Sequence, residues 1–251
     1  MSNKSRRNTA GVSLSILFAL SLAHFFNDMY QSIVSAVYPI IKDNLGLNFK
    51  QIGLVALVYQ ICASVFQPVF GIFFDKRPSV WYLSLGTMST LTGLLIFAFA
   101  GSLPWVVLAV MFIGLGSSII HPEASRLTHY ASGGQHGLGQ SIFQVGGNFG
   151  SSIGPLLAAL IIAPFGQKYI AVFAGIAVIS IITKTPIVRW YRERINQYNA
   201  SSAKKEVIHR VRLSKKKNLL VAGNSFDTYF FQICLHCQPY QLLYILSDRK
   251  I

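Results

Sequence analysis

The sequence predicts an all-α integral membrane protein, a six-helix transmembrane bundle, and three observations lead to that class. Of the 251 residues, 52% are hydrophobic and only 12% are charged, against about 25% charged in an ordinary soluble domain. The apolar residues gather in six runs of the length that crosses the hydrocarbon core of a bilayer. The connections between the runs are short, so we expect consecutive helices to be antiparallel.

The expected spans follow one another within residues 1–188, which we predict to form the bundle. They are Val12–Tyr38, Ile52–Phe74, Val80–Ala100, Trp105–Ser125, Leu138–Ala163 and Tyr169–Val188. The first run is longer than the apolar region of a signal peptide, and no small-residue cleavage site follows it. We therefore interpret it as a retained first span.

The positions of Lys and Arg predict the orientation. If the N-terminus is cytoplasmic, sixteen of these residues lie beside inner ends of spans and three beside outer ends, as the positive-inside rule requires. We expect a multi-pass protein of the plasma (inner) membrane, with the N-terminus and the linker cytoplasmic. Because the net charge of +14 is carried by these loops, the lipid bilayer is the expected partner and nucleic acid is not.

Two segments follow the bundle. Residues 189–217 are a basic cytoplasmic linker, for which a disordered connector is favoured over a short amphipathic helix at the lipid headgroups. Residues 218–251 form an atypical C-terminal tail that polar residues interrupt before a clean span can form. Its Cys234 and Cys237 have no second pair of ligands, so zinc is not expected, and the sequence predicts no metal or other cofactor.

Polar side chains recur at helical spacing inside four of the spans. In the first span His24, Asp28, Gln31 and Ser35 share one helical face, and Asn27 lies beside it. The stripe of the second span is Gln60, Ser64, Gln67 and Gly71. That of the fourth span is Gly114, Ser118, His121 and Ser125, next to Glu123. That of the fifth span is Gln140, Gln144, Asn148 and Ser151. We expect these four spans to enclose an aqueous cavity and the third and sixth to face lipid. Interhelical hydrogen bonding without a cavity is the alternative.

Asp28 is the strongest single candidate for a functional residue. A charged side chain at mid-depth in a membrane costs about 2.5–3.5 kcal/mol, so it is expected to serve a function. Its expected role is proton carrier or substrate contact, with His24 one turn away; the alternative is an Asp that only hydrogen bonds to neighbouring helices. Glu123 lies near the inner interface, where Arg126 can form a surface ion pair with it.

A hypothesis from another class of protein is an intramembrane metal-dependent hydrolase. Its metal site would consist of His24, Asp28, His121 and Glu123. The spacing of these residues does not match a recognised zinc pattern, so this is the less favoured reading.

Four stretches of the sequence resemble a known family. They are HFFNDMYQS in the first span, FQPVFGIFFDKRPSVW after the second, GSSIIHPEASR in the fourth, and ASGGQHGLGQSIFQVGGNFGSSIGPLLAALIIAPFG in the fifth. Over about residues 10–217 the chain is similar to the major facilitator superfamily, and more closely to its fosmidomycin resistance branch of drug efflux transporters.

The resemblance assigns roles to two motifs. A Gly-xxx-Asp-basic motif gates the cytoplasmic side of such transporters, and the residues that match it are Gly71, Asp75 and Lys76. The Gly-Arg-Arg that normally completes this motif is absent. A fifth-helix motif is found in the proton antiporters, and the residues that resemble it are Gly150, Gly154 and Pro155.

The resemblance also implies a function. Members of the family usually have twelve helices in two six-helix halves, so we expect this chain to be an N-terminal half followed by the linker. The expected activity is drug:proton antiport that exports a small antibiotic such as fosmidomycin, which is transport and not enzyme chemistry. Alternating access needs two lobes, so a second six-helix half or a second copy is expected.

One further alternative accompanies this expectation. The chain could be a non-transporting membrane remnant, since one bundle alone should not transport. From about Leu220 the tail no longer resembles the expected seventh helix. A shift of reading frame or a shortened gene would cause this loss of resemblance.

Overall fold

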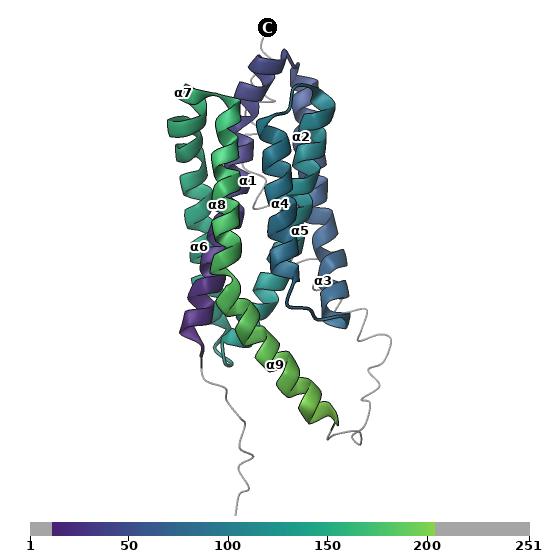
Figure 1. Cartoon of the computed structure of the whole chain (residues 1–251), viewed down its shortest axis with the longest axis vertical. Coiled ribbons are helices and arrows are strands. Elements are labelled where there is room, and N and C mark those ends of the chain that lie inside the picture. Colours follow the sequence, from purple (N-terminus) through teal and green to yellow (C-terminus); the bar gives the residue numbers. More distant parts are fainter. Residues whose placement is uncertain (1–11, 204–251) are drawn as a thin grey trace, which may run out of the picture. The chain divides into compact units, whose positions relative to one another are not determined.

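The structure, a computed structural model, describes the backbone of residues 12–203 and the side chains of residues 12–196. Within these residues it contains helices and turns and no strand, which confirms the all-α prediction. The tail at residues 218–251, with its cysteine pair, and the later part of the linker lie outside the described residues. Six long helical rods follow one another in the predicted order (Figure 1).

The rods are made of nine α-helices and three short turns of other helix types within the described range. The first three rods are α1 (Leu14–Leu45), then α2 (Phe49–Gln60) with the π-helical turn η1 (Ile61–Val65) and α3 (Phe66–Lys76), then α4 (Tyr82–Ala98). The next three are α5 (Leu103–Ala131), then α6 (His136–Leu157) with the π-helical turn η2 (Ala158–Ile162) and α7 (Ala163–Phe165), then the 3-10 turn η3 (Gln167–Tyr169) with α8 (Ile170–Thr183). The helix α9 (Thr185–Ala203) follows and is the last in the described range.

Local sequence signals set the turn between the first two rods. Gly46 ends α1 with a φ of 61°, a left-handed conformation that glycine adopts without steric cost. Asn48 begins α2, and its side chain accepts a hydrogen bond from the backbone N–H of Gln51 at 2.9 Å. The Gln51 side chain accepts one from the Asn48 N–H at 2.9 Å, which completes a capping box.

Several helices are longer than the predicted spans. The helix α1 continues past Tyr38 to Leu45, and α5 continues past Ser125 to Ala131. Both extensions carry charged side chains, Lys42 and Arg126 among them. An α-helix satisfies its own backbone hydrogen bonds, so it does not have to end where the apolar run ends.

Four rods are long and apolar enough to cross a membrane by length and composition alone: Phe49–Lys76, Leu103–Ala131, His136–Phe165 and Gln167–Asn196. The helix α4 is apolar but has only 17 residues. The helix α1 has 32 residues and is not among these four, because its stripe of polar side chains lowers its mean hydropathy. The two rods that do not meet these criteria are therefore α4, which is short, and α1, which carries the polar stripe.

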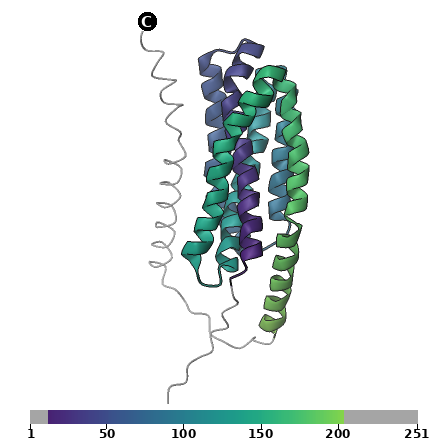
Figure 2. The ribbon, with the colours of Figure 1, turned by 90° about the vertical axis from the view of Figure 1, so that its left-hand side faces the viewer.

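The helices α1 and α6 lie side by side and share the most extensive contact of any pair of described helices (Figure 2). A Cβ atom added to Gly150 would lie 2.2 Å from the carbonyl oxygen of Phe25, and one added to Gly146 would lie 2.1 Å from that of Ser21. The Gly150 and Gly154 pair was expected to let another backbone approach closely, and the structure confirms this, with α1 as the partner.

Replacing Gly150 by alanine is expected to destabilise the protein by about 1–3 kcal/mol, because the new methyl group would meet backbone atoms of α1 that cannot move aside locally. Thermal unfolding of the purified protein in detergent measures this. The matched control is Gly175→Ala in α8, where an added Cβ would meet nothing within 4 Å. That control should be neutral or slightly stabilising, and equal losses from both variants would contradict the packing argument.

The third and sixth spans were expected to face lipid, and exposed apolar side chains are found on these two rods and on others as well. The helices α4 and α8 pack against each other and expose apolar side chains such as Leu85 and Ile182. The rods that contain α3 and α6 do the same, for example at Val69 and Phe149. Outward-facing apolar residues therefore occur on all four of these rods.

The sixth rod breaks before its predicted end at Val188. The helix α8 ends at Thr183 and α9 begins at Thr185, followed at once by Pro186. Proline has no N–H to donate, and its ring crowds the carbonyl one turn earlier. At the break, the side chain of Lys184 is buried and donates a hydrogen bond to the Thr87 hydroxyl of α4.

The prediction of a disordered connector is wrong for residues 189–203, which are helical. Ile187 and Tyr191 on α9 are buried in a hydrophobic cluster with residues of α1, α4, α5 and α6. Arg189, Arg192 and Glu193 are exposed. The segment is an amphipathic helix whose apolar face packs on the bundle, which is why it is ordered despite its charge.

Candidate functional site

A buried cluster of titratable side chains lies between α1 and α5. The exposed fractions of the side chains are 3% for His24, 5% for Asp28 and 19% for His121. The Oδ2 atom of Asp28 lies 3.2 Å from Nε2 of His24, and its Oδ1 atom lies 3.4 Å from Nε2 of His121. The helical spacing within α1 predicts the first contact, while the second depends on how α5 packs against α1.

Two amide side chains of α1 complete the cluster. Nδ2 of Asn27 lies 3.1 Å from Oδ1 of Asp28 and 3.0 Å from Nε2 of His121. Nε2 of Gln31 lies 3.2 Å from each of the same two atoms. The hydroxyl of Tyr59 on α2 donates to Oε1 of Gln31 at 2.5 Å. Sequence reasoning missed Tyr59, because a tyrosine beside an apolar run carries no signal of a polar role.

The imidazole of His24 is held by α6. Its Nδ1 atom lies 2.9 Å from the carbonyl oxygen of Phe143, and the Phe143 ring stacks on it with centroids 4.0 Å apart. A Cβ atom added to Gly147 would lie 2.4 Å from the ring. A carbonyl oxygen only accepts hydrogen bonds, so Nδ1 carries the hydrogen, and Nε2 faces Asp28.

The charges of the cluster are balanced by histidine. Within the described part of the chain, the ion pairs of Asp28 are with His24 and His121 and not with a Lys or Arg. Histidine changes its charge near physiological pH, whereas Lys and Arg stay charged. The net charge of this buried cluster can therefore change by the gain or loss of one proton.

Three members of the cluster are close enough together to hold a metal ion, since ligand atoms of His24, Asp28 and His121 lie within 4.8 Å of one another. The hydrogen bonds argue against that use, because the amides of Asn27 and Gln31 already donate to the Asp28 oxygen that faces His121. Glu123, the fourth residue of the proposed metal site, forms an ion pair with Arg126 instead. The arrangement is that of a hydrogen-bonded cluster.

Glu123 belongs to a second polar group, centred on Arg126. Nη2 of Arg126 donates to both carboxylate oxygens of Glu123, at 2.9 and 2.7 Å, and to the hydroxyl of Tyr191 on α9 at 2.9 Å. Nη1 donates to the carbonyl oxygen of Phe74 at 3.1 Å and lies 3.9 Å from Oδ1 of Asp75. The Glu123 side chain is only 1% exposed, so the prediction of a surface ion pair is wrong and the pair is buried.

The other residues predicted for the site lie apart from the cluster. Gln67 donates to the carbonyl of Ala63, and Gln144 to the side chain of Asn148, each one turn away on its own rod. Gln60 is half-buried, whereas Gln140 and Asn148 are exposed. Of the first predicted motif, Asp75 approaches Arg126 and Lys76 is exposed. A Cβ atom added to Gly71 would lie 3.6 Å from the side chain of Pro122 on α5. Pro155 of the second motif lies three residues before the π-helical turn η2.

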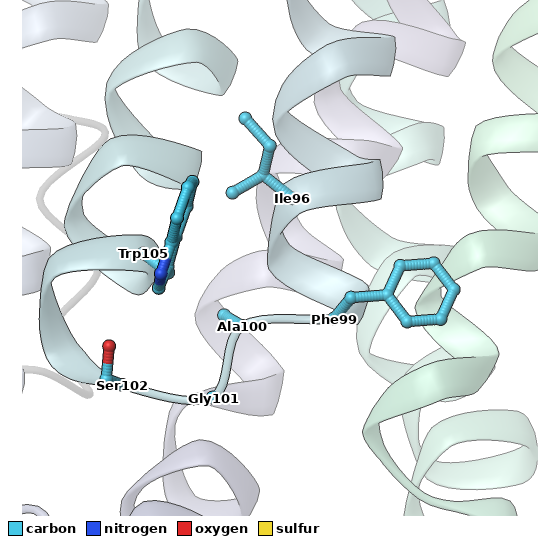
Figure 3. A pocket seen from close by; sticks show the side chains of 6 residues that line it. All are labelled: Ile96, Phe99, Ala100, Gly101, Ser102 and Trp105. Carbon is cyan, nitrogen blue, oxygen red and sulfur yellow. The ribbon is translucent and has the colours of Figure 1, made fainter.

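A surface hollow lies at the turn between α4 and α5. The residues that line it are Ile96, Phe99, Ala100, Gly101, Ser102 and Trp105 (Figure 3). Trp105 stands beside Ile96, and the ring of Phe99 points to the other side of the turn. The lining contains none of the residues of the polar stripes, so this hollow is not the cavity predicted from them.

Comparison with known proteins identifies the class. The profile of the Major Facilitator Superfamily matches residues 20–246. The chain therefore belongs to the Major Facilitator Superfamily, whose members are transporters and not enzymes. This confirms the resemblance, and it removes the intramembrane hydrolase hypothesis.

Individual relatives are consistent with that membership. The fosmidomycin resistance protein of Escherichia coli (strain K12) is 47% identical over 242 residues, which is 95% of this chain and 58% of the relative. The uncharacterized MFS-type transporter YfnC of Bacillus subtilis (strain 168) is 39% identical over 76% of this chain and 47% of its own length. The probable sulfoacetate transporter SauU of Cupriavidus necator is 27% identical over 64% of this chain and 37% of its own length.

Two further facts follow from these matches. The chain spans about half of the length of the curated relatives it matches. The family match continues to residue 246, beyond residue 217, where the likeness was expected to end.

Proposed function

We propose that this chain forms one lobe of a drug:proton antiporter that exports a small antibiotic such as fosmidomycin across the plasma (inner) membrane. The observation that carries the proposal is the cluster of His24, Asp28 and His121. Its carboxylate is buried among membrane-spanning helices and is balanced by two groups that take up and release protons. An ionisable residue in such a place is costly and is characteristic of proton and substrate pathways.

The relatives support the substrate class. The E. coli relative is named for resistance to fosmidomycin, and export is the simplest way for a transporter to confer resistance. The more distant relative from Cupriavidus necator is named for sulfoacetate, which is also a small organic anion. We therefore propose small anionic molecules as the transported class, with proton movement in the opposite direction.

The orientation and the partner complete the proposal. The excess of Lys and Arg beside one set of helix ends supports a cytoplasmic N-terminus and a cytoplasmic linker. The Arg126 group, together with Gly71, Asp75 and Lys76, would then form the cytoplasmic gate. The amides Gln60, Gln67, Gln140, Gln144 and Asn148 would line the pathway toward a second lobe, which is either a second six-helix half or a second copy of this chain.

The test is an efflux assay in everted membrane vesicles with an imposed pH gradient. The chain is expressed alone, with the second half of the E. coli relative, and beside the intact relative as positive control. We expect fosmidomycin movement only with both lobes present and only while the gradient lasts. If the pair stays at background while the intact relative works, the chain is a non-transporting remnant. Full activity of the chain alone would show that a second half is unnecessary.

A further inference from the structure

The π-helical turn η1 of the second rod lies just before a proline, Pro68. Proline has no backbone N–H to donate. In the i→i−5 pattern of a π-helix, a donor at position 68 would bond to the carbonyl oxygen of Ala63. The fifth rod shows the same pairing, since η2 lies just before Pro164. A missing backbone donor therefore accompanies each of the two π-helical turns in the described part of the chain.

Two side chains donate to backbone carbonyl oxygens at η1. Nε2 of Gln67 donates to the carbonyl oxygen of Ala63 at 2.7 Å. The hydroxyl of Ser64 donates to that of Gln60 at 2.5 Å. Ala63 is buried, and a buried carbonyl without a donor is costly. The amide of Gln67 thus supplies from a side chain the donor that Pro68 lacks.

The turn η1 also sets the position of Tyr59, which lies two residues before it. The hydroxyl of Tyr59 donates to Oε1 of Gln31 at 2.5 Å, and this bond fixes which way the Gln31 amide faces. Nε2 of Gln31 then lies 3.2 Å from Oδ1 of Asp28 and from Nε2 of His121. On its other side the rod packs against α5, because a Cβ atom added to Gly114 would lie 2.9 Å from the carbonyl oxygen of Tyr59.

We propose that Gln67 is a positioning residue of the buried cluster. By replacing the missing N–H of Pro68 it holds η1 in place, and through η1 it holds the hydroxyl of Tyr59 against Gln31. This task is additional to a place on the substrate pathway. The inference rests on the proposed function only for the part that the cluster plays in transport.

The position of η1 gives this role a wider meaning. Before the turn, Tyr59 contacts the buried cluster. After it, α3 leads to the carbonyl oxygen of Phe74, which accepts a hydrogen bond from Arg126. The turn is therefore the joint between the part of the rod that contacts the cluster and the part that contacts the Arg126 group. A change in its helical pattern would rotate one part against the other.

The test is the NMR signal of the His121 ring, recorded at one fixed pH on the purified chain in lipid nanodiscs. The ring lies 3.2 Å from Nε2 of Gln31, so its signal reports the place of that amide. Tyr59→Phe is the reference variant, because it removes the hydroxyl that holds Gln31. Gln67→Met keeps the length of the side chain but cannot donate. We expect it to shift the His121 signal in the same direction as Tyr59→Phe and by a similar amount.

Rescue by a backbone donor separates this role from general packing. Pro68→Ala restores an N–H where it is missing, so the double variant Gln67→Met and Pro68→Ala should return the His121 signal to that of the unmodified chain. Thr92→Val is the matched control. Thr92 also donates to a carbonyl four residues earlier, but it does so on α4, which contains no proline. This control should leave the signal unchanged.

The outcomes are distinct. An unshifted His121 signal in Tyr59→Phe or in Gln67→Met would overturn the proposal, and so would a shift that Pro68→Ala does not reverse. If Gln67→Met alone does not fold, the double variant decides: a folded protein with the unmodified signal supports the role, and a second failure to fold overturns it. The readout involves no transport, so an inactive pair in the vesicle assay would contradict the proposed function and leave this role standing.

Discussion

Asp28→Asn is expected to reduce pH-driven fosmidomycin export to the background of empty vesicles when the chain is paired with a second half. The asparagine keeps the size of the side chain and the hydrogen bond from Asn27, but it cannot take up a proton. Position 28 would then stay uncharged through the whole cycle, and the buried carboxylate that pairs with His24 would be lost. Substrate could still bind, but its movement would no longer be tied to that of a proton.

The measurement is initial export rate against the size of the imposed pH gradient. Asp43→Asn is the matched control, because that carboxylate is 77% exposed near the end of the same helix. It should leave the rate unchanged. If Asp28→Asn exports at the normal rate at every gradient, then Asp28 is not the proton carrier, and the structural alternative of an Asp held only by hydrogen bonds is correct.

Arg126→Ala is expected to cause the largest loss of stability, about 3–5 kcal/mol, because it leaves the carboxylate of Glu123 buried without a partner. It also removes the hydrogen bonds that join α5 to the carbonyl of Phe74 and to Tyr191. For a domain of this size the melting temperature should fall by roughly 10 °C. Thermal unfolding in detergent, followed by circular dichroism, measures the shift.

A double-mutant cycle tests the cause of that loss. Adding Glu123→Gln to Arg126→Ala removes the unpaired charge, so it should recover a large part of the stability. Arg192→Ala on α9, where the side chain is exposed, is the control and should change the melting temperature little. If the double variant is no more stable than Arg126→Ala, the unpaired charge is not the cause.

The order of the spans could be predicted from the sequence because a membrane imposes one length and one composition on each crossing. The ends of the helices could not, since α1 and α5 continue into polar sequence and Pro186 with Lys184 divides the last rod. A short amphipathic helix in the linker, as seen at residues 189–203, was only the less favoured alternative. Its charge suggests disorder, and its apolar face is recognised only once the bundle supplies a surface for Ile187 and Tyr191.

Contacts between site residues on the same helix could be predicted from the sequence, whereas contacts between residues on different helices could not. The contacts of His24 and Asn27 with Asp28 follow from their places on α1. The position of His121 and the hydroxyl of Tyr59 depend on packing between helices that are distant in sequence. The stripe in the second span, which assumes a regular repeat of 3.6 residues, runs through the π-helical turn η1. Such a turn holds an extra residue, so positions before and after it do not keep the expected phase.

The close approach of α6 to α1 has a mechanical consequence. Backbone atoms of the two helices meet at Gly146 and Gly150 with no room for a side chain between them, so neither helix can slide or tilt without the other. The two helices must move together as one rigid unit, in which His24 stays in contact with Phe143. A conformational change that exposes the buried carboxylate of Asp28 therefore has to come from movement of α5 and α2, on the side away from α6.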